Sequence, residues 1–565
     1  MTGDLPERVA AWITGDPDAA DRAELASLPA GELAQRFSAP LTFGTAGLRG
    51  PVRAGPNGMN VAVVTRTTAG IAAWLQARCL GGSTVVVGRD ARHGSAAFAT
   101  VAAEVLAAAG FPVVMLPGPT PTPLVAYAVR ALGAQLGVQI TASHNPAGDN
   151  GYKVYLDGGA QLVAPADREI EAAIAGIGRA VDVPRTPVRP TEHPLVRDYL
   201  ARVSTLPAGP ARELRIALTP LHGVGGPLAV EALRAAGFTE IHTVASQFAP
   251  DPDFPTVTFP NPEEPGATDA LLDLASRVEA DLAIALDPDA DRCAVGIPTA
   301  TGWRMLTGDE TGALLGAHLL ARQPDGADPL VATTIVSSQL LERIASARGA
   351  RFAQTLTGFK WLVRAGSGLV YAYEEAVGHC VDPDAVRDKD GISAAVVAAG
   401  LAATLKAAGR TLQDALDDLA VEFGVHATSQ VSRRVARVEE VAAIMARFRA
   451  DLPTDVAGAP VVAEDLLHRR GQAATDAVIL TGERLRVVVR PSGTEPKLKC
   501  YLEVVEPVDG PADLPRARAA AARSLRDCAR FLPRSGGGFM RSSQQGARRA
   551  SPPDYASRGF RGDAR

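Results

Sequence analysis

Residues 83–116 read STVVVGRDARHGSAAFATVAAEVLAAAGFPVVML. The run of valines before a polar turn predicts a buried strand at 83–90. The alanine-rich stretch at 95–110 predicts a helix that ends at Gly110, and 111–116 predicts a second strand. A strand, a helix and a further strand in succession are typical of a βαβ unit, so this stretch favours an α/β fold with a mainly parallel sheet.

The same alternation continues to residue 141 and recurs twice further along the chain. The segment from about 440 onward differs, because helices near 439–450 and 512–530 flank a hairpin-like stretch, which is typical of a smaller α+β domain. We expect strands at 136–141 in the first unit, at 214–220, 240–245 and 281–287 in the second, and at 330–338, 350–356 and 368–375 in the third.

These patterns predict three related mixed-sheet α/β domains and a smaller C-terminal α+β domain around a central cleft. A chain of 565 residues is long enough for several cores. The end of the chain is rich in Gly, Ser, Arg and Pro and cannot bury enough apolar surface to offset the entropy of ordering, so we predict that it is disordered. The predicted ranges are 1–207, 208–322, 323–435 and 436–534 for domains I to IV, and 535–565 for the tail.

Composition narrows the class of protein. The formal net charge of -5 argues against a general nucleic-acid binder. The five cysteines are scattered without a C-x-x-C pair, which argues against a disulfide framework or a thiolate zinc site and fits a reducing compartment. The N-terminal stretch is acidic and lacks a long apolar run, and the apolar stretch near 392–405 is too short to span a bilayer. We therefore expect a cytoplasmic protein with no nucleic-acid and no membrane partner.

The segment TASHNPAGDNGYK, residues 141–153, directly follows a predicted buried strand. Open α/β sheets bind ligands at the carboxyl ends of their strands, so Ser143 is placed where a serine can accept a phosphoryl group. His144 can donate hydrogen bonds to phosphate oxygens, and Lys153 can act as a general acid or base if neighbouring cations or burial lower its pKa. The alternative is a plain surface turn that contains a serine.

The segment DPDADR, residues 287–292, also follows an apolar strand. Asp287, Asp289 and Asp291 stay ionised together only beside water or a cation, and hard oxygen ligands favour Mg²⁺. Arg292 can pair with a phosphate. An EF-hand is excluded because Arg292 stands at the glycine position and Pro298 at that of the bidentate glutamate. A solvated acidic turn is the remaining alternative.

Two further segments carry weaker signals. In EEAVGH, residues 374–379, acids, a glycine bend and His379 suit the binding of vicinal sugar hydroxyls, although His379 can equally be a satisfied, partly buried residue. In RPSGTEPK, residues 490–497, an arginine, two hydroxyls and backbone N–H groups suit a phosphate cradle, with a hairpin-edge loop as the alternative. Smaller basic segments carry Arg49 and Arg53, then Arg89, Arg92 and His93, then Lys360, and then Arg387 and Lys389.

Taken in this order, TASHNP, DPDADR, EEAVGH and RPSGTEPK resemble the phosphoserine, metal, sugar-recognition and phosphate-binding loops of the α-D-phosphohexomutase superfamily. The resemblance extends from about Leu41 to Glu503. FGTAGLRG at 43–50 and EEAVGHCVDPDAVRDKDGISAA at 374–395 are most similar to the branch of phosphopentomutase and glucose-1,6-bisphosphate synthase.

The resemblance implies a phosphosugar mutase that interconverts sugar 1-phosphate and 6-phosphate, of glucose or mannose, through a phosphoserine and a bisphosphate. It also implies Mg²⁺, glucose 1,6-bisphosphate as activator, and a monomer or weak dimer. Its implied catalytic residues are Ser143, Lys153, His144, Arg49 and Arg292; its metal ligands are Ser143, Asp287, Asp289 and Asp291; its substrate-binding residues are Lys360, Glu375, His379, Arg490, Ser492, Gly493 and Thr494.

One position departs from the pattern. Many hexomutases have a serine two residues after the glutamate of the sugar loop, where this chain has Val377. Valine cannot hydrogen-bond a hydroxyl, which leaves pentose phosphates open as substrates. Phosphopentomutase and glucose-1,6-bisphosphate synthase are therefore alternatives. An aspartyl-phosphate phosphatase acting through Asp287 and a non-catalytic sugar-phosphate sensor are more distant ones.

Overall fold

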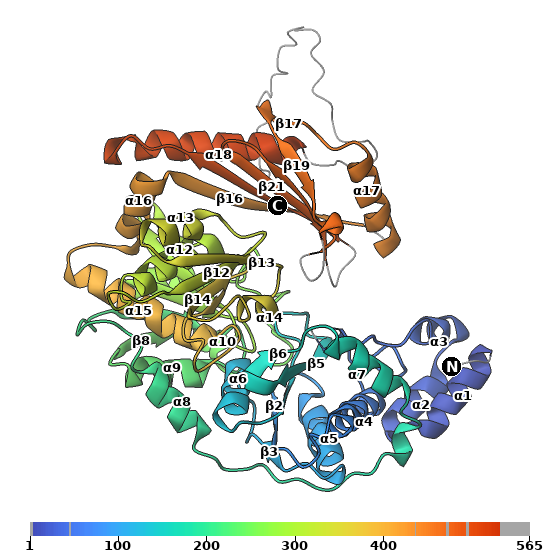
Figure 1. The fold of residues 1–565 in the computed structure, drawn as a ribbon. Helices are drawn as coiled ribbons and strands as arrows, with labels where there is room; N and C mark the ends of the chain where they lie inside the picture. The colour runs from blue at the N-terminus through green and yellow to red at the C-terminus, as the bar shows by residue number, and fades with distance from the viewer. Residues whose placement is uncertain (1–3, 45–46, 436, 470–473, 493–496, 532–565) are drawn as a thin grey trace, which may run out of the picture.

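The computed structural model describes residues 4–44, 47–435, 437–469, 474–492 and 497–531. Figure 1 shows an arc of domains, from the first (blue to teal) through the second (green) and third (yellow) to the fourth (orange to red). The predicted disordered tail at 535–565 lies outside the described residues.

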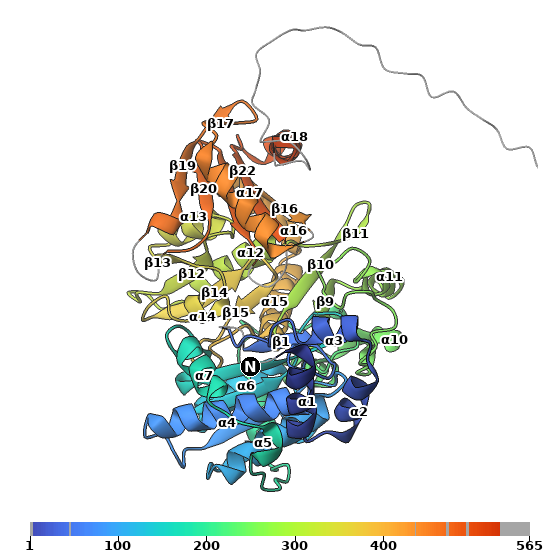
Figure 2. The ribbon, with the colours of Figure 1, turned by 90° about the vertical axis from the view of Figure 1, so that its right-hand side faces the viewer.

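The first domain is built on a sheet in the order β1-β5-β4-β2-β3, with β6 paired to β5. Figures 1 and 2 show three short N-terminal helices, α1 to α3, at one edge of this domain. The strands are β1 (Leu48–Pro51), β2 (Val85–Arg89), β3 (Val113–Met115), β4 (Leu136–Ile140), β5 (Asp149–Leu156) and β6 (Ala160–Gln161), and the helices are α1 (Leu5–Gly15), α2 (Ala19–Ser27), α3 (Ala30–Arg36), α4 (Val61–Ala77), α5 (Ser95–Ala108), α6 (Thr122–Ala131), α7 (Ala166–Ala175) and α8 (Leu195–Val203).

The second and third domains have sheets in the orders β11-β10-β9-β7-β8 and β13-β12-β14-β15. The second contains β7 (Arg215–Thr219), α9 (Gly226–Ala235), β8 (Glu240–Thr243), α10 (Ala245–Phe248), α11 (Asp269–Arg277), β9 (Leu282–Leu286), β10 (Cys293–Thr299) and β11 (Gly302–Met305). The third contains α12 (Gly308–Leu320), β12 (Leu330–Thr334), α13 (Leu340–Ala347), β13 (Arg351–Thr355), α14 (Phe359–Leu362), β14 (Leu369–Glu374), β15 (Gly378–Cys380), α15 (Gly391–Ala407) and α16 (Leu412–Phe423).

These three sheets share one strand order. Three parallel strands lie in the order third, first, second, as β4-β2-β3, β9-β7-β8 and β14-β12-β13. An antiparallel strand, β5, β10 or β15, then pairs with the third parallel strand. The prediction of three related mixed-sheet domains is confirmed. Each of the first three predicted functional loops is the connection between a parallel strand and its antiparallel neighbour.

The fourth domain has an antiparallel sheet in the order β16-β22-β21-β20-β19. Its apolar core forms where one face of this sheet meets α17 and the end of α18. Its elements are β16 (Val425–Arg434), α17 (Val438–Ala450), β17 (Asp455–Val456), β18 (Ala459–Pro460), β19 (Val462–Asp465), β20 (Val478–Thr481), β21 (Leu485–Pro491), β22 (Lys497–Glu506) and α18 (Leu514–Phe531).

The sheets divide the chain differently from two predicted boundaries. β16, which falls inside the range predicted for the third domain, pairs along its whole length with β22. α12, which falls inside the range predicted for the second, packs on the third-domain sheet, where Gly312 lies against the ring of Tyr373. A Cβ on Gly312 would lie 2.6 Å from that ring. The other predicted boundaries stay predictions.

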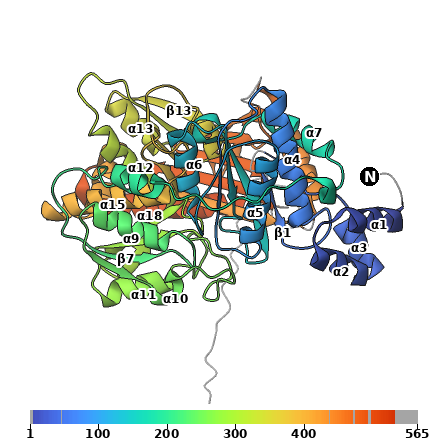
Figure 3. The ribbon, with the colours of Figure 1, turned by 90° about the horizontal axis from the view of Figure 1, so that it is seen from below.

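α15 joins the second and third domains. Residues 391–403 of this helix are buried, and Figure 3 shows it between α9 on one side and α12 on the other, both of which it contacts. Its start is capped by the Asp390 carboxylate, which accepts hydrogen bonds from the N–H groups of Ile392 and Ser393 at 3.1 Å. In the described part of the chain, no single helix is long and apolar enough to cross a membrane, although α15 and α16, bent by 89°, pass that test of length and composition as a pair.

The fourth domain is attached to the segment that follows β12. Glu503 on β22 accepts hydrogen bonds through Oε1 from Ser338 Oγ at 2.6 Å and from the N–H of Gln339 at 2.9 Å. Behind this segment, the buried carboxylate of Asp309 accepts hydrogen bonds through Oδ1 from the N–H of Ser338 at 2.7 Å and from Tyr373 OH at 3.0 Å. Buried acids therefore hold both sides of one short segment at the junction of the two domains.

Asp309→Asn is expected to stabilise the protein at alkaline pH. Burial, with Glu375 and Glu503 nearby, raises the pKa of Asp309 to about 7. The folded state therefore holds the Asp309 proton more tightly than the unfolded state, so stability falls as pH rises from about 4 to 7 and stays lower above that range. Asparagine keeps the Oδ1 acceptor without ionising. We therefore expect the free energy of unfolding of Asp309→Asn to exceed that of the parent by on the order of 2–4 kcal/mol at pH 8, and this difference to shrink towards pH 5.

Thermal unfolding of both proteins at pH 5, 6, 7 and 8 measures this difference. Asp281→Asn is the control, because Asp281 pairs with the half-exposed Lys406 away from this junction. A difference between Asp309→Asn and the parent that does not change with pH would contradict the assignment.

Candidate active site

Ser143 lies in the connection between β4 and β5 and reaches across to the second domain. Its N–H donates to Thr141 Oγ1 at 2.9 Å, and the residue is 3% exposed. Its Oγ donates to Asp287 Oδ2 at 2.8 Å and lies 3.2 Å from His144 Nδ1. The serine predicted to carry a phosphoryl group and the first aspartate of the predicted metal loop are therefore in direct contact, although 144 residues separate them.

A residue with a strained backbone lies in each of the three loops that connect β4 to β5, β9 to β10 and β14 to β15. Ser143, Ala290 and Val377 have φ values of 53°, 55° and 50°, in the left-handed region that residues other than glycine rarely adopt. Such a conformation costs on the order of 1–3 kcal/mol and persists only where the surroundings hold it. The three loops are therefore held in shape by their contacts.

Asp287, Asp289 and Asp291 form a buried triad of carboxylates. They are 0%, 0% and 1% exposed, and one oxygen from each lies within 4.8 Å of the others. Oδ1 of Asp289 and Oδ1 of Asp291 are buried and have no hydrogen-bond partner among the described residues. Buried carboxylate oxygens without partners are costly, and a hard divalent cation with oxygen ligands satisfies them. The donor set fits a metal ion of the Mg²⁺ type.

Two lysines neutralise the other side of this triad. Lys153 Nζ lies 2.6 Å from Asp289 Oδ2 and 2.8 Å from Asp291 Oδ2, and Lys389 Nζ lies 3.2 Å from Asp291 Oδ2. Burial alone would lower the pKa of Lys153, but the two aspartates outweigh it and raise that pKa above its usual value. The condition on which Lys153 would act as a general base, a lowered pKa, is therefore not met in this structure, and the two aspartates favour the protonated lysine.

The other charges of the site follow from burial. Burial and the neighbouring Asp289 and Asp291 raise the pKa of Asp287 well above its usual value. Burial, with Arg292 and Arg49 nearby, lowers the pKa of His144 well below its usual value, so its imidazole is neutral at pH 7.

Arg49 and Arg292 flank the serine and the triad. Arg49 Nη1 donates to Asn145 Oδ1 at 3.0 Å. The N–H of Arg292 donates to Asp287 Oδ1 at 3.0 Å, and its Nη1 lies 3.3 Å from Glu263 Oε2. Both predicted cations therefore belong to the same group of side chains as Ser143.

Glu375 of the sugar loop lies at a pocket between the second, third and fourth domains. Its Oε2 accepts from Ser337 Oγ at 3.3 Å and from Thr334 Oγ1 at 3.4 Å, and burial raises its pKa. The pocket has a volume of about 410 Å³ and is also lined by Glu263 and Tyr501. Glu375 is thus placed where a polyhydroxylated ligand can reach a carboxylate.

Val377 lines the same pocket as Glu375. It is 2% exposed and packs in an apolar cluster with second-domain residues such as Ala294. Its carbonyl accepts a hydrogen bond from the N–H of Cys293 at 3.0 Å. Val377 therefore anchors the sugar loop to the second domain and gives the pocket an apolar contact in place of a hydroxyl.

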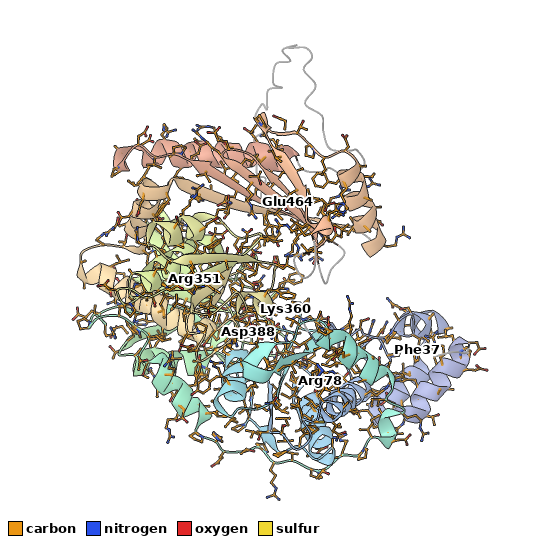
Figure 4. All side chains as sticks on the ribbon, in the orientation of Figure 1. Phe37, Arg78, Arg351, Lys360, Asp388 and Glu464 are labelled. Carbon is orange, nitrogen blue, oxygen red and sulfur yellow. The ribbon has the colours of Figure 1, made fainter. Side chains whose placement is uncertain are left out.

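Among the described contacts, His379 and Lys360 make none with the three aspartates. His379 is 0% exposed, its Nδ1 lies 3.0 Å from Tyr371 OH, and burial lowers its pKa to about 3. This geometry favours the structural interpretation of His379 over sugar binding. Lys360 lies on α14, on the side of the third domain that faces the first (Figure 4), and burial lowers its pKa to about 8.

The phosphate-binding segment is described only at its ends. Arg490 lies near the end of β21, Ser492 directly follows that strand, and the N–H of Ser492 donates to the carbonyl of Lys497 at 2.8 Å. Gly493 and Thr494 lie outside the described residues. Lys499 on β22 is close enough to Glu375 for the carboxylate to oppose the lowering of its pKa by burial. The fourth domain thus contributes a cation beside the sugar loop.

Sequence reasoning missed two contributors to the triad. Thr122, at the start of α6, donates through Oγ1 to Asp289 Oδ2 at 2.5 Å, and its N–H donates to the Asp289 carbonyl at 2.9 Å. Lys389 was noted only as one of several basic residues. No motif marks Thr122, whereas the charged run RDKDG at 387–391 was a usable signal for Lys389.

Comparison with known proteins finds family models along most of the chain. Four family models match the chain in succession, described as phosphoglucomutase/phosphomannomutase α/β/α domains I, II and III and C-terminal domain, at residues 40–180, 197–300, 307–423 and 431–532.

Curated relatives cover most of the chain. A protein of Haemophilus influenzae named "Probable phosphomannomutase" is 42% identical over 79% of this chain and 93% of its own length. A mouse phosphopentomutase is 33% identical over 90% of this chain and 91% of its own. A phosphoglucomutase of Staphylococcus aureus is 31% identical over 83% of this chain and 90% of its own.

Solved structures share the fold at low identity. A phosphoglucomutase/phosphomannomutase family protein from Burkholderia thailandensis matches with a TM-score of 0.64 and 22% identity over 85% of this chain and 96% of its own. The open form of parafusin, a phosphoglucomutase from Paramecium, matches with a TM-score of 0.66 and 19% identity over 87% of this chain and 96% of its own.

Proposed function

Because the chain belongs to the phosphoglucomutase/phosphomannomutase family, we propose that it interconverts sugar 1-phosphates and 6-phosphates through a phosphoserine at Ser143. The observation that carries this proposal is the contact of Ser143 Oγ with a buried aspartate triad that has two unpartnered oxygens. A serine beside a hydrated divalent ion and several cations is suited to phosphoryl transfer, which depends on positioning and charge neutralisation.

The metal site is part of the proposal. Asp287, Asp289 and Asp291 would hold Mg²⁺ together with an oxygen on Ser143, and the bound ion would neutralise charge on the transferring phosphoryl group. A phosphoserine carries a charge of about -1.5 to -2. The cations that this chain supplies around it are Lys153, Lys389, Arg49 and Arg292.

The transfer proceeds in two balanced steps. In the first step the phosphorus–oxygen bond to Ser143 breaks as one forms to a sugar hydroxyl, and the proton of that hydroxyl passes to Ser143 Oγ, which produces a bisphosphate. After the sugar turns, the second phosphate transfers to Ser143 Oγ, and the serine proton passes to the sugar oxygen that is released. Asp287 Oδ2, at 2.8 Å from Ser143 Oγ, and the neutral imidazole of His144, with Nδ1 at 3.2 Å, are the groups that can relay this proton. Protonated Lys153 stabilises the charge that develops.

Hexose phosphates are the proposed substrates, and glucose 1,6-bisphosphate is the proposed activator. The identity of 42% to the Haemophilus phosphomannomutase against 33% to the mouse phosphopentomutase favours glucose or mannose over a pentose. Pentose phosphates and bisphosphate synthesis are the second candidates, because Val377 lines the pocket of Glu375 and offers no hydroxyl to a sugar there. Lys360, Arg490, Ser492 and Glu375 are the proposed substrate-binding residues.

An assay with four substrates tests the proposal. Glucose, mannose, ribose and deoxyribose 1-phosphates are compared with Mg²⁺ and a trace of glucose 1,6-bisphosphate. We expect kcat/KM for a hexose phosphate to exceed that for either pentose at least about tenfold. A higher value for a pentose would reassign the substrate, and no turnover of any of the four would refute the mutase.

The proposal includes a cytoplasmic monomer or weak dimer. All five cysteines are free, and four of them are buried, which supports a reducing compartment.

A further inference from the structure

Four carbonyl oxygens of the phosphoserine loop converge on one guanidinium. Arg92, in the connection between β2 and α5, is 4% exposed. Its Nη2 donates to the carbonyls of Ser143 at 2.6 Å and Asn145 at 2.5 Å, and its Nη1 donates to those of Pro146 at 2.8 Å and Asp149 at 3.2 Å. The loop therefore wraps around the end of this side chain.

This arrangement has a physical requirement. Four carbonyl dipoles that point at one place repel each other unless a donor with several N–H groups in a fixed plane lies between them. The planar fork of arginine meets this requirement, whereas a lysine ammonium presents three donors from one point. Because the Ser143 carbonyl is one of the four, Arg92 fixes the peptide next to the strained φ of 53° at Ser143.

A side chain of the second domain packs against a face of the Arg92 guanidinium. Its carbon lies 4.8 Å from the ring centroid of Phe254, an arrangement with a favourable cation–π interaction. Phe254 is 4% exposed and has a φ of 48°, so it too is held in a strained conformation. Next to it, Asp253 Oδ1 lies 2.7 Å from His93 Nε2. The segment around Phe254 thus covers Arg92 at the junction of the first two domains.

We propose that Arg92 is a positioning residue that directs Ser143 Oγ towards Asp287, and that Phe254 couples this loop to the second domain. The inference rests on the proposed function, because it assigns Arg92 to the placement of the phosphoryl acceptor. The backbone N–H of Arg92 also donates to Asp90 Oδ1 at 2.9 Å, and its Nε lies 3.5 Å from Asp90 Oδ2 in an ion pair. Arg92 is therefore held from three sides, and the loop takes its shape from it.

Arg92→Lys and Arg92→Ala test the role of the fork. We expect kcat to fall at least about 100-fold in Arg92→Ala and at least about tenfold in Arg92→Lys, with KM for the sugar phosphate changed less than about threefold, because Arg92 lies under the loop. Guanidinium ion at millimolar concentration is expected to restore part of kcat in Arg92→Ala but none in Ser143→Ala. Arg89→Ala is the matched control, since the Arg89 guanidinium donates to the Asp90 carbonyl and to no carbonyl of the loop among the described contacts.

Three outcomes overturn the inference. They are a wild-type kcat in Arg92→Lys, a folded Arg92→Ala with unchanged kcat, and a loss in Arg92→Ala that appears mainly in KM and does not respond to guanidinium. If Arg92→Ala does not fold, Arg92→Lys decides.

Phe254→Leu tests the second part of the proposal, because leucine keeps an apolar side chain at this position without the ring. A kcat of Phe254→Leu unchanged from the parent would refute the coupling of the loop to the second domain. Parent enzyme without mutase turnover would refute the proposed function, whereas active parent with equally active Arg92 variants would refute only this inference.

Discussion

Ser143→Ala loses at least about 10⁴-fold in kcat for sugar-phosphate isomerisation, because the variant has no oxygen to accept the phosphoryl group. Asp287 also loses the hydrogen bond of 2.8 Å that Ser143 Oγ donates to it. A buried acceptor that loses one donor costs on the order of 1–3 kcal/mol, so the variant is expected to fold with a modestly lower midpoint of thermal unfolding.

Two measurements check this prediction. The first is isomerisation of glucose 1-phosphate in a coupled assay. The second is the mass of the intact protein after incubation with glucose 1,6-bisphosphate, where the parent gains one phosphoryl group and Ser143→Ala gains none. Ser204→Ala is the control, since Ser204 Oγ donates only to the Ala201 carbonyl after the end of α8. Near-normal turnover in Ser143→Ala would eliminate the phosphoserine.

Treatment of the phosphorylated parent protein with hydroxylamine identifies the type of residue that carries the phosphoryl group. A phosphoserine survives hydroxylamine, whereas an acyl phosphate on Asp287 is cleaved by it. Loss of the added mass in hydroxylamine would favour the aspartyl-phosphate alternative. We expect the mass to be retained, because Asp287 Oδ2 is occupied by the Ser143 hydroxyl.

Asp289→Asn raises the Mg²⁺ concentration for half-maximal activity at least about tenfold and lowers kcat at least about 100-fold. Asp289 Oδ1 is a buried oxygen without a partner, and Oδ2 accepts from Lys153 Nζ at 2.6 Å and Thr122 Oγ1 at 2.5 Å. An amide removes one negative charge from the triad and presents an N–H₂ group either to the metal or to the Lys153 ammonium, and both contacts are unfavourable.

Titration of activity with Mg²⁺ measures this effect, and the rise in the midpoint of thermal unfolding on adding Mg²⁺ measures binding without turnover. We expect the parent to be stabilised by the ion and Asp289→Asn to be stabilised much less. Asp281→Asn should behave as the parent, because Asp281 directly precedes β9, at the opposite end of that strand from the triad. A magnesium titration of Asp289→Asn that superimposes on that of the parent would refute the metal assignment.

Much of the fold could be predicted from local patterns. The valine-rich strand now described as β2 and the alanine-rich helix α5 depend on side chains close together in the chain. The antiparallel strands β5 and β10 were not predicted, because they pair with β4 and β9 through registers that local periodicity does not encode. β16 was placed in the wrong domain for the same reason, since its partner β22 lies more than sixty residues later.

Within the candidate site, the sequence by itself determined the residues whose chemistry is local. Three aspartates at alternate positions repel each other wherever they fold, and a serine after a buried strand lies at the edge of its sheet, so Ser143 and Asp287 could be named from their neighbours in the chain.

Only the tertiary structure decided what surrounds them. Lys389 and Thr122 reach the triad from other domains, and the pKa of Lys153 is raised because folding places two carboxylates beside it. His379 became a core residue because its strand is covered on both faces. Electrostatic and hydrogen-bond energies depend on distances between atoms, and folding sets those distances between residues that are far apart in the chain.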